Sequence, residues 1–475
     1  MDIDILEKAL ESALSLGASY AEVRYHSIKS FTTYILNNRV LGASYGDSEG
    51  ISVRVLANGG LGFASTSIIN NKNNVIDAAR KAVLVARASA TSRRKPIRFS
   101  NERPSNLRYS VLEKVSLSSI PDEDKVDMLR DIVKSVDLDR SPIKVTSYTV
   151  SYEDGIEKKM IVTSEGTRVE SAIPRVEVFY NISATSGDRS ANRWNQLGAT
   201  GGLEVLKNMD LGSVIDDDVN SLYINIVKAE QLPRKTKLDV VLSPEIVALS
   251  THEAAGHPSE ADRVLGREAA QAGLSYRIEL KEGYQIGSEH VTIIDDPTIP
   301  GSYGFYLVDD EGIQARPKIL VEKGVLKELL HNRETAGEYG INSNASARAM
   351  DYRSEPIVRM SNTYLAPGDY ELDELVEDVK EGIYMKKYME WNIDDYRWGA
   401  RYVGLEAYYI KNGRIMQPLR NVILEITTKD YYSSIDAVGR DLTFFAGTCG
   451  KGEPPQPLPV WMGGPHVRLR NVEVK

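Results

Sequence analysis

Two hydrophobic periods alternate along the first half of the chain. Apolar residues that return every three to four positions, as Leu6, Leu10 and Ala13 do, predict amphipathic helices. Apolar residues that alternate with polar ones, as Ala21 and Val23 do, predict half-buried strands. The predicted helices cover 6–14, 75–90, 122–136 and 210–230. The predicted strands include 21–25, 51–55, 61–63, 148–152, 160–162 and 176–182, with turns at Asn58-Gly59-Gly60 and Asp154-Gly155.

A polar stretch interrupted by proline separates two such groups of helix and strands. It covers 91–106 and contains the basic cluster Arg93-Arg94-Lys95, which we interpret as solvated surface. Leu232-Pro233 indicates a second boundary. The predicted domains are therefore an N-terminal α+β domain (residues 1–105), a central α+β domain (106–232) and a C-terminal domain (233–475).

The C-terminal domain is predicted to begin with a strand that leads into a helix. Leu238 to Leu242 form a short apolar run, and Ser243-Pro244-Glu245 is a typical helix start with proline in the first turn. Beyond about residue 280 strands and turns predominate, including 291–294, 319–321, 403–410 and 422–426. The fold class is therefore α+β, with small N-terminal helix-and-sheet domains before a large β-rich C-terminal domain that carries one active-site helix.

Charge and cysteine content exclude several classes of protein. The 475 residues include 58 Lys and Arg against 67 Asp and Glu, a net charge of −9, and no basic run is long enough to follow a phosphate backbone. The single cysteine cannot form an internal disulfide. No basic and apolar leader opens the sequence, and no run of about 18 apolar residues follows. We expect a cytoplasmic protein that binds neither nucleic acid nor membrane.

The segment His252-Glu253-Ala254-Ala255-Gly256-His257 is the strongest chemical signal. Two imidazoles are suitable zinc ligands, and Glu253 beside the first can take a proton from an activated water. Five residues advance a regular α-helix by about 500°, which leaves the two side chains roughly 140° apart. Gly256 weakens the helix and Pro258 disfavours a helical His257. We therefore predict a π-bulge or unwinding at Gly256-His257 that brings the imidazoles together.

Zinc in a catalytic site takes a third protein ligand, which spacing alone leaves open. Cys449 lies in the glycine-rich loop 447–452, whose backbone can approach another element closely. The candidates for the third ligand are Cys449, Glu260, Asp262, His290, His331 and His466.

The acidic segment Asp309-Asp310-Glu311-Gly312 lacks the alternating ligands of a calcium loop and is predicted to be a solvated turn.

Several segments together resemble TldD-type peptidases of the TldD/PmbA family. They are the histidine segment 252–257, 301–312, Arg359-Met360-Ser361-Asn362-Thr363, Glu406-Ala407-Tyr408 and Gly447-Thr448-Cys449-Gly450-Lys451. The resemblance implies zinc held by His252, His257 and Cys449, with Glu253 as the catalytic carboxylate. It also implies hydrolysis of short or unfolded polypeptides by a dimer, often with a non-catalytic TldE/PmbA-like partner. Pro258, Ser259 and the stretch 391–402 depart from the family pattern.

Two other functions use the same residues. A non-catalytic peptide-binding subunit would hold a structural zinc in a closed site of four ligands. A metal hydrolase acting on a non-peptide amide would differ only in its substrate.

A peptidase also needs a group that stabilises the negatively charged oxygen formed during the reaction. The candidates for this group are Tyr303, Arg359 and Asn362.

Overall fold

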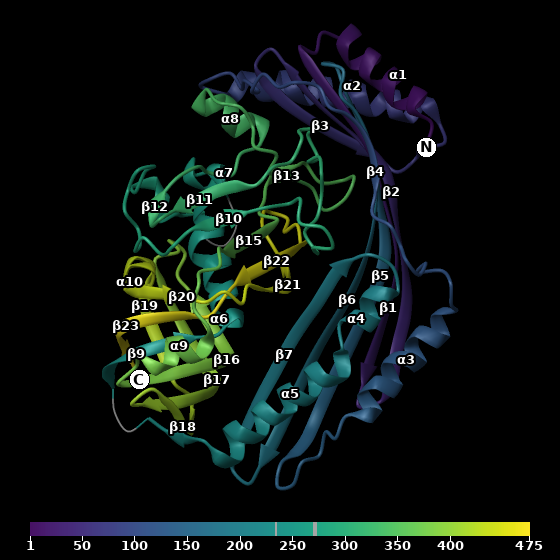
Figure 1. Cartoon of the computed structure of the whole chain (residues 1–475). Coiled ribbons are helices and arrows are strands. Elements are labelled where there is room, and N and C mark those ends of the chain that lie inside the picture. Colours follow the sequence, from purple (N-terminus) through teal and green to yellow (C-terminus); the bar gives the residue numbers. More distant parts are fainter. Residues whose placement is uncertain (233–234, 269–272) are drawn as a thin grey trace.

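Long antiparallel strands dominate the N-terminal half of the computed structural model, which describes residues 1–232, 235–268 and 273–475. The strands β1 and β2 pair from Tyr20 opposite Leu56 to Leu36 opposite Arg39, with one register shift. The sheet has the order β3-β2-β1-β5-β6-β4, and β7 also pairs with β6. Figure 1 shows it running along one side of the molecule. The bounds are β1 Tyr20–Leu36, β2 Arg39–Ala57, β3 Gly60–Thr66, β4 Asn106–Ser110, β5 Lys144–Thr163, β6 Arg168–Ser186 and β7 Arg189–Thr200.

Two groups of helices pack against this sheet, one near each end (Figure 1). The apolar faces of α1 and α2 form one core with β1 to β3, and α5 and α3 form another with β5 to β7. These helices confirm the 3.6-residue periodicity read from the sequence. No helix in the described part of the chain is both long and apolar enough to cross a membrane. The bounds are α1 Ile3–Ser15, α2 Lys72–Ser92, α3 Asp122–Ser135, α4 Glu204–Asn208, α5 Leu211–Tyr223 and the π-helix η1 Ile224–Lys228.

The turn predicted at Asp154-Gly155 is wrong, because β5 continues through it as one strand. Asp154 is buried and accepts hydrogen bonds from Lys125 and Tyr152 at 2.6 Å each. A Cβ on Gly155 would lie 2.6 Å from the carbonyl oxygen of Lys29 in β1, so glycine serves close strand packing here. Asp154 is therefore held by contacts with α3 and within β5, and Gly155 by its contact with β1, so no local turn forms here.

The first predicted domain boundary interrupts a continuous sheet, and the second lies partly outside the described residues. Strands from both sides of residue 105 share the N-terminal sheet, so the first two predicted domains have one continuous framework. The second boundary, Leu232-Pro233, includes Pro233, which lies outside the described residues. The division of the chain into three domains stays a prediction.

The C-terminal region consists mainly of an eight-stranded and a six-stranded sheet, and the helix α6 packs against strands of both. One large apolar core joins them, and the predicted α+β class is confirmed. The strands are β8 Glu230–Gln231, β9 Thr236–Leu242, β10 Ile293–Asp295, β11 Lys318–Glu322, β12 Val325–Leu326, β13 Ala347–Arg348, β14 Ile357–Val358, β15 Asn362–Leu365, β16 Glu381–Ile393, β17 Gly399–Lys411, β18 Arg414–Arg420, β19 Ile423–Thr427, β20 Ile435–Val438, β21 Thr443–Cys449, β22 Leu458–Gly464 and β23 Val467–Val474. The helices are α6 Pro244–Thr251, η2 His252–Gly256, η3 His257–Ser259, α7 Ala261–Val264, η4 Tyr276–Ile278, α8 Arg333–Tyr339, α9 Leu372–Glu377 and α10 Thr428–Ser434.

Buried ion pairs join the N-terminal sheet to the C-terminal region. Asp309, Asp310 and Glu311 are at most 3% exposed, so the solvated turn predicted for them is wrong. Arg54 of β2 donates to Glu311 at 2.6 Å, and Lys159 of β5 lies 2.8 Å from Asp310. The basic partners come from strands far away in the sequence, which local composition cannot reveal.

Replacing Arg54 tests this junction. Arg54→Met removes the guanidinium that pairs with Glu311 and with Glu22 and leaves two buried carboxylates without it. We expect the free energy of unfolding to fall by about 3–5 kcal/mol, measured by urea denaturation. Arg80→Met, which breaks an exposed pair with Asp77 on α2, is the matched control and should cost about 0.5 kcal/mol or less. Equal losses in the two variants would contradict the role given to Arg54.

Candidate metal centre

The helix that carries the histidine segment changes its hydrogen bonding at the first histidine. Pro244 occupies the first turn of α6, as predicted, and the regular helix ends at Thr251. A π-helical turn, η2, follows, in which the N–H of His257 donates to the carbonyl of His252. An i to i+5 bond brings residues five apart onto successive turns, so both imidazoles lie on one side. Their ring centroids are 5.0 Å apart, and of the two predicted alternatives, a π-bulge or unwinding, the π-bulge is confirmed.

Gly256 is required here for a reason that the sequence did not reveal. Its φ and ψ are helical, but a Cβ would lie 2.0 Å from the sulfur of buried Met360. Although Pro258 disfavours a helical conformation for the residue before it, His257 is helical, with φ −55° and ψ −44°. Pro258 sits in a single 3-10 turn, where its ring is tolerated.

The backbone groups released by the irregular turn find partners in the surrounding structure. The Tyr276 hydroxyl donates to the carbonyl of Ala254 at 2.8 Å, and the Ser259 hydroxyl donates to that of Ala255 at 2.7 Å. Buried carbonyls without partners would be costly, so these two side chains stabilise the π-turn.

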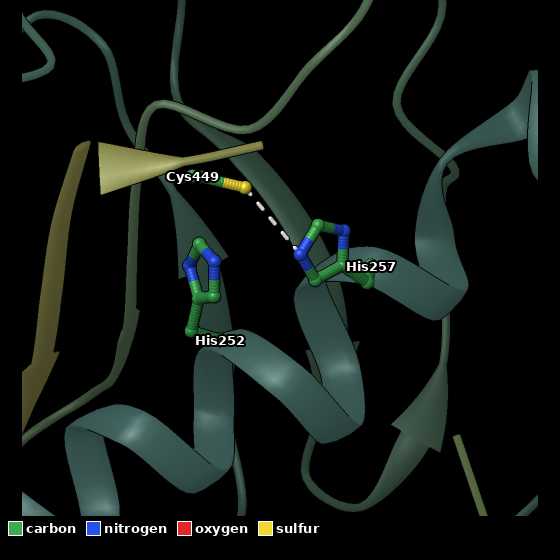
Figure 2. A group of neighbouring side chains, drawn as sticks. All are labelled: His252, His257 and Cys449. Carbon is green, nitrogen blue, oxygen red and sulfur yellow. Dashed lines mark hydrogen bonds between the residues drawn. The ribbon is translucent and has the colours of Figure 1, made fainter. Parts of the chain in front are cut away.

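Cys449 reaches the histidines from the end of β21. Its Sγ lies 3.4 Å from Nε2 of His257, and ligand atoms of His252, His257 and Cys449 all lie within 4.8 Å of one another. Figure 2 shows the two rings and the sulfur converging on one space. Arg359 donates to the carbonyls of Cys449 and, at 2.5 Å, of Gln456, and so ties the two ends of the loop after β21.

The three side chains form a donor set that suits zinc. Imidazole nitrogen and thiolate sulfur are preferred zinc ligands, and the Nδ1 of buried His252 has no hydrogen-bond partner within the described residues. Burial opposes charge on the Cys449 thiol, but His257, Arg359 and His252 outweigh it and bring its pKa well below the usual range. Burial also opposes charge on His257, yet Cys449 and Glu260 raise its pKa to about 9. Without a metal the site therefore favours a Cys449 thiolate beside a protonated His257, and metal binding would require His257 to lose its proton.

Glu260 supports the site and is not one of the converging side chains. Its Oε2 lies 3.1 Å from Nδ1 of His257, on the ring nitrogen opposite to the one that faces Cys449. Lys451 and Arg263 each lie 3.4 Å from the same oxygen. A carboxylate on the second nitrogen fixes the orientation of a ligating imidazole. The sequence offered Glu260 as a candidate ligand, and the structure gives it this supporting position.

The other candidate third ligands lie elsewhere. Asp262 pairs with Lys451 at 2.6 Å. His290 is exposed, and His331 is buried beside Thr335 with a pKa that burial lowers to about 4. His466 contacts Asp441 and Tyr384. None of these side chains belongs to the converging group, in which Cys449 is the third member.

Glu253 faces the same cavity as the three converging side chains. The cavity measures about 760 Å³, and its lining includes the aromatic rings of Trp194, Tyr388 and Trp391. Glu253 Oε2 accepts a hydrogen bond from Arg397 Nη1 at 2.6 Å. Sequence reasoning missed Arg397, because it lies in a hairpin loop without a recognisable motif.

The three candidate oxyanion donors serve structural contacts. The Tyr303 hydroxyl donates to Glu177, and the Asn362 amide donates to the carbonyl of Asp296 at 2.7 Å and to Ser302 at 2.9 Å. Arg359 is committed to the loop after Cys449. None of the three lines the cavity that holds Glu253.

Comparison with protein-family models gives three successive matches. Residues 21–90 match PmbA/TldA metallopeptidase domain 1, residues 116–227 match the central domain, and residues 235–475 match the C-terminal domain. The last match contains the histidine segment and Cys449.

Curated proteins and solved structures also resemble the chain over its whole length. A metalloprotease of Methanocaldococcus jannaschii is 34% identical over 98% of both chains. A zinc metalloprotease TldD homolog of Saccharolobus solfataricus is 29% identical over 98% of this chain and 99% of its own. The crystal structure of TldE from Thermococcus kodakarensis shares the fold, with a TM-score of 0.78 at 16% identity and 99% coverage of both chains.

The contact between Gly256 and Met360 can be tested through metal affinity. In Gly256→Ala the new methyl group collides with the Met360 sulfur, so the π-turn must shift and the imidazoles must separate. We expect zinc affinity to fall about 10- to 100-fold, measured by competition with a chelating dye. Met360→Ala alone should keep its affinity, and Gly256→Ala/Met360→Ala should recover most of it. Unchanged affinity in Gly256→Ala would show that this contact does not hold the turn.

Proposed function

The chain belongs to the PmbA/TldA metallopeptidase family, and from that membership we propose that it is a zinc-dependent peptidase acting on short or unfolded polypeptides. One observation carries the proposal: His252, His257 and Cys449 converge in a cavity that Glu253 also lines. Metal-assisted amide hydrolysis needs a set of metal-ligating side chains and a carboxylate that line the same cavity.

His252, His257 and Cys449 would hold the zinc ion. Within the described residues no fourth His, Cys, Asp or Glu joins their group, which favours a catalytic site over a closed structural one. When bound, zinc would activate a water molecule and polarise the substrate carbonyl. The Glu260 carboxylate holds the His257 ring, and Arg359 holds the backbone of Cys449.

Glu253 would carry out the proton transfers of the reaction. It follows His252 directly in the chain, so the π-turn fixes both side chains, and it faces the cavity. As general base it accepts a proton from the attacking water, and it then passes a proton to the leaving amine. Its side chain is only 10% exposed, which limits competition from bulk water.

The cavity supports peptides as the substrate class. Its walls include the aromatic rings of Trp194 and Trp391, which are suitable for apolar side chains, and its volume is within the usual range for ligand sites. A folded domain cannot enter about 760 Å³, whereas an extended segment can. This favours short peptides or unfolded chains over native proteins.

We further propose that the chain acts as a dimer, either with itself or with a non-catalytic TldE-like partner. The full-length structural likeness to TldE supports a partner of the same architecture. Light scattering after gel filtration should give twice the chain mass of 52.7 kDa. The mass of a single chain at every protein concentration tested would contradict a homodimer. The heterodimer would then be tested by adding a TldE-like chain.

The separate roles of metal and carboxylate give a direct test. Glu253→Gln keeps a side chain of the same shape but cannot accept a proton, so we expect it to retain zinc and to lose at least about 100-fold in peptide hydrolysis. Each of His252→Ala, His257→Ala and Cys449→Ala should lose zinc together with activity. Zinc content would be measured by mass spectrometry, and cleavage with a library of unstructured peptides.

The outcomes separate the competing functions. Undiminished hydrolysis in Glu253→Gln would refute the catalytic assignment. Tight zinc binding in the wild type, with no cleavage of any peptide, would favour the peptide-binding subunit with a structural metal. Cleavage of small non-peptide amides alone would favour the other hydrolase.

A further inference from the structure

Arg397 makes the one hydrogen bond that the Glu253 carboxylate receives within the described residues. Nη1 of Arg397 donates to Oε2 of Glu253 at 2.6 Å, and the side chains are 13% and 10% exposed. Charge-assisted hydrogen bonds with such little exposure are short and strong, and they hold both partners in place. The second carboxylate oxygen, Oε1, has no hydrogen bond among those of the described residues, and the Glu253 side chain lines the cavity.

Two hydrogen bonds hold the backbone of Arg397 in the hairpin between β16 and β17. Its N–H donates to the carbonyl of Asp394 at 3.0 Å, and its carbonyl accepts from the Thr428 hydroxyl at 2.8 Å. The next residue, Trp398, packs edge-on against Tyr276, whose hydroxyl caps the π-turn. The loop is thus braced, through Tyr276, against the segment that carries Glu253.

Arg397 occupies a backbone conformation that would suit glycine better. Its φ is +62°, in the left-handed region that non-glycine residues seldom adopt. Glycine adopts this conformation without steric cost. An arginine at a position that favours glycine indicates that its side chain is needed.

The other cations near the cavity are engaged elsewhere. Lys451 pairs with Asp262 and Glu260, and Arg263 lies against Glu260. Arg397 is therefore the cation that faces Glu253. Its Nε is buried and has no hydrogen-bond partner within the described residues, so the guanidinium is committed to the carboxylate and not to a network of its own.

We propose that Arg397 is a positioning residue that fixes the catalytic carboxylate of Glu253 through the Oε2 hydrogen bond. The proposal rests on the proposed peptidase function. With Oε2 held, Oε1 is the oxygen left to exchange protons with the attacking water and the leaving amine. Arg397 does not contact the reacting atoms, and its effect passes through the orientation of Glu253.

Kinetic variants test this role. Arg397→Met keeps the length of the side chain without the charge, and Arg397→Gly relaxes the left-handed backbone. We expect both to retain zinc and to lower kcat about 10- to 100-fold with little change in KM, because a catalytic group displaced by about 1 Å can cost this much. Arg397→Lys should recover part of kcat. The matched control is Arg401→Met, which breaks an exposed pair with Glu390 on the same hairpin and should leave kcat unchanged.

Three results would overturn the proposal. Full activity in Arg397→Gly would mean that the residue only shapes the hairpin. A raised KM with unchanged kcat, which disappears for peptides with an amidated C-terminus, would mean that Arg397 binds the substrate carboxylate. Crystal structures of Arg397→Met with Glu253 in its wild-type orientation would exclude positioning, and this readout does not depend on activity.

The same experiments separate this inference from the proposed function. A wild type and a Glu253→Gln variant with equal activity would refute the function itself. A wild type that depends on Glu253, combined with Arg397→Met and Arg397→Gly variants of normal kcat, would refute only the role of Arg397.

Discussion

The single π-helical turn from His252 to Gly256 is the constraint on which the candidate site depends. A regular α-helix would place the two imidazoles roughly 140° apart, and the i to i+5 bond from His257 to His252 brings them to one side. Such a turn is stable only when surrounding side chains bond to its freed carbonyl groups and leave space for its backbone. Tyr276 and Ser259 bond to carbonyls in the turn, and Met360 leaves room for glycine alone at position 256.

The rest of the centre is assembled around this turn from distant parts of the chain. Cys449 arrives at the end of β21, and Arg359 bonds to the loop on both of its sides. Glu260 orients His257, and Lys451 and Arg263 lie against Glu260 in turn. A metal bound by the two histidines and Cys449 would link the π-turn to the end of β21, so metal binding and folding of the C-terminal region should be coupled.

The N-terminal sheet contributes a wall of the cavity as well as a framework. Trp194 and Gln196 of β7 line the cavity, and Gln196 donates to Thr448 beside Cys449 at 2.7 Å. The Trp461 ring nitrogen donates to the carbonyl of Gly198, also at 2.7 Å. Together with the buried pair of Arg54 and Glu311, these contacts fix the sheet against the C-terminal region that carries the candidate metal centre. The shape and charge of this cavity are therefore set by both halves of the molecule.

The sequence by itself determined the long helices of the N-terminal half, the α+β class and the need for an irregular turn between His252 and His257, because periodicity, proline position and residue spacing are local properties. Spacing alone left the third side chain open, and only the resemblance to a family singled out Cys449. The turn expected at Asp154-Gly155 and the solvated turn expected at 309–312 were wrong, since both segments are buried against strands remote in sequence. Tertiary structure alone decided the contact of Met360 with Gly256, the place of Glu260 behind His257 and the pairing of Arg397 with Glu253. These contacts depend on which side chains the fold brings within a few ångströms of one another, and local sequence patterns carry no information about that.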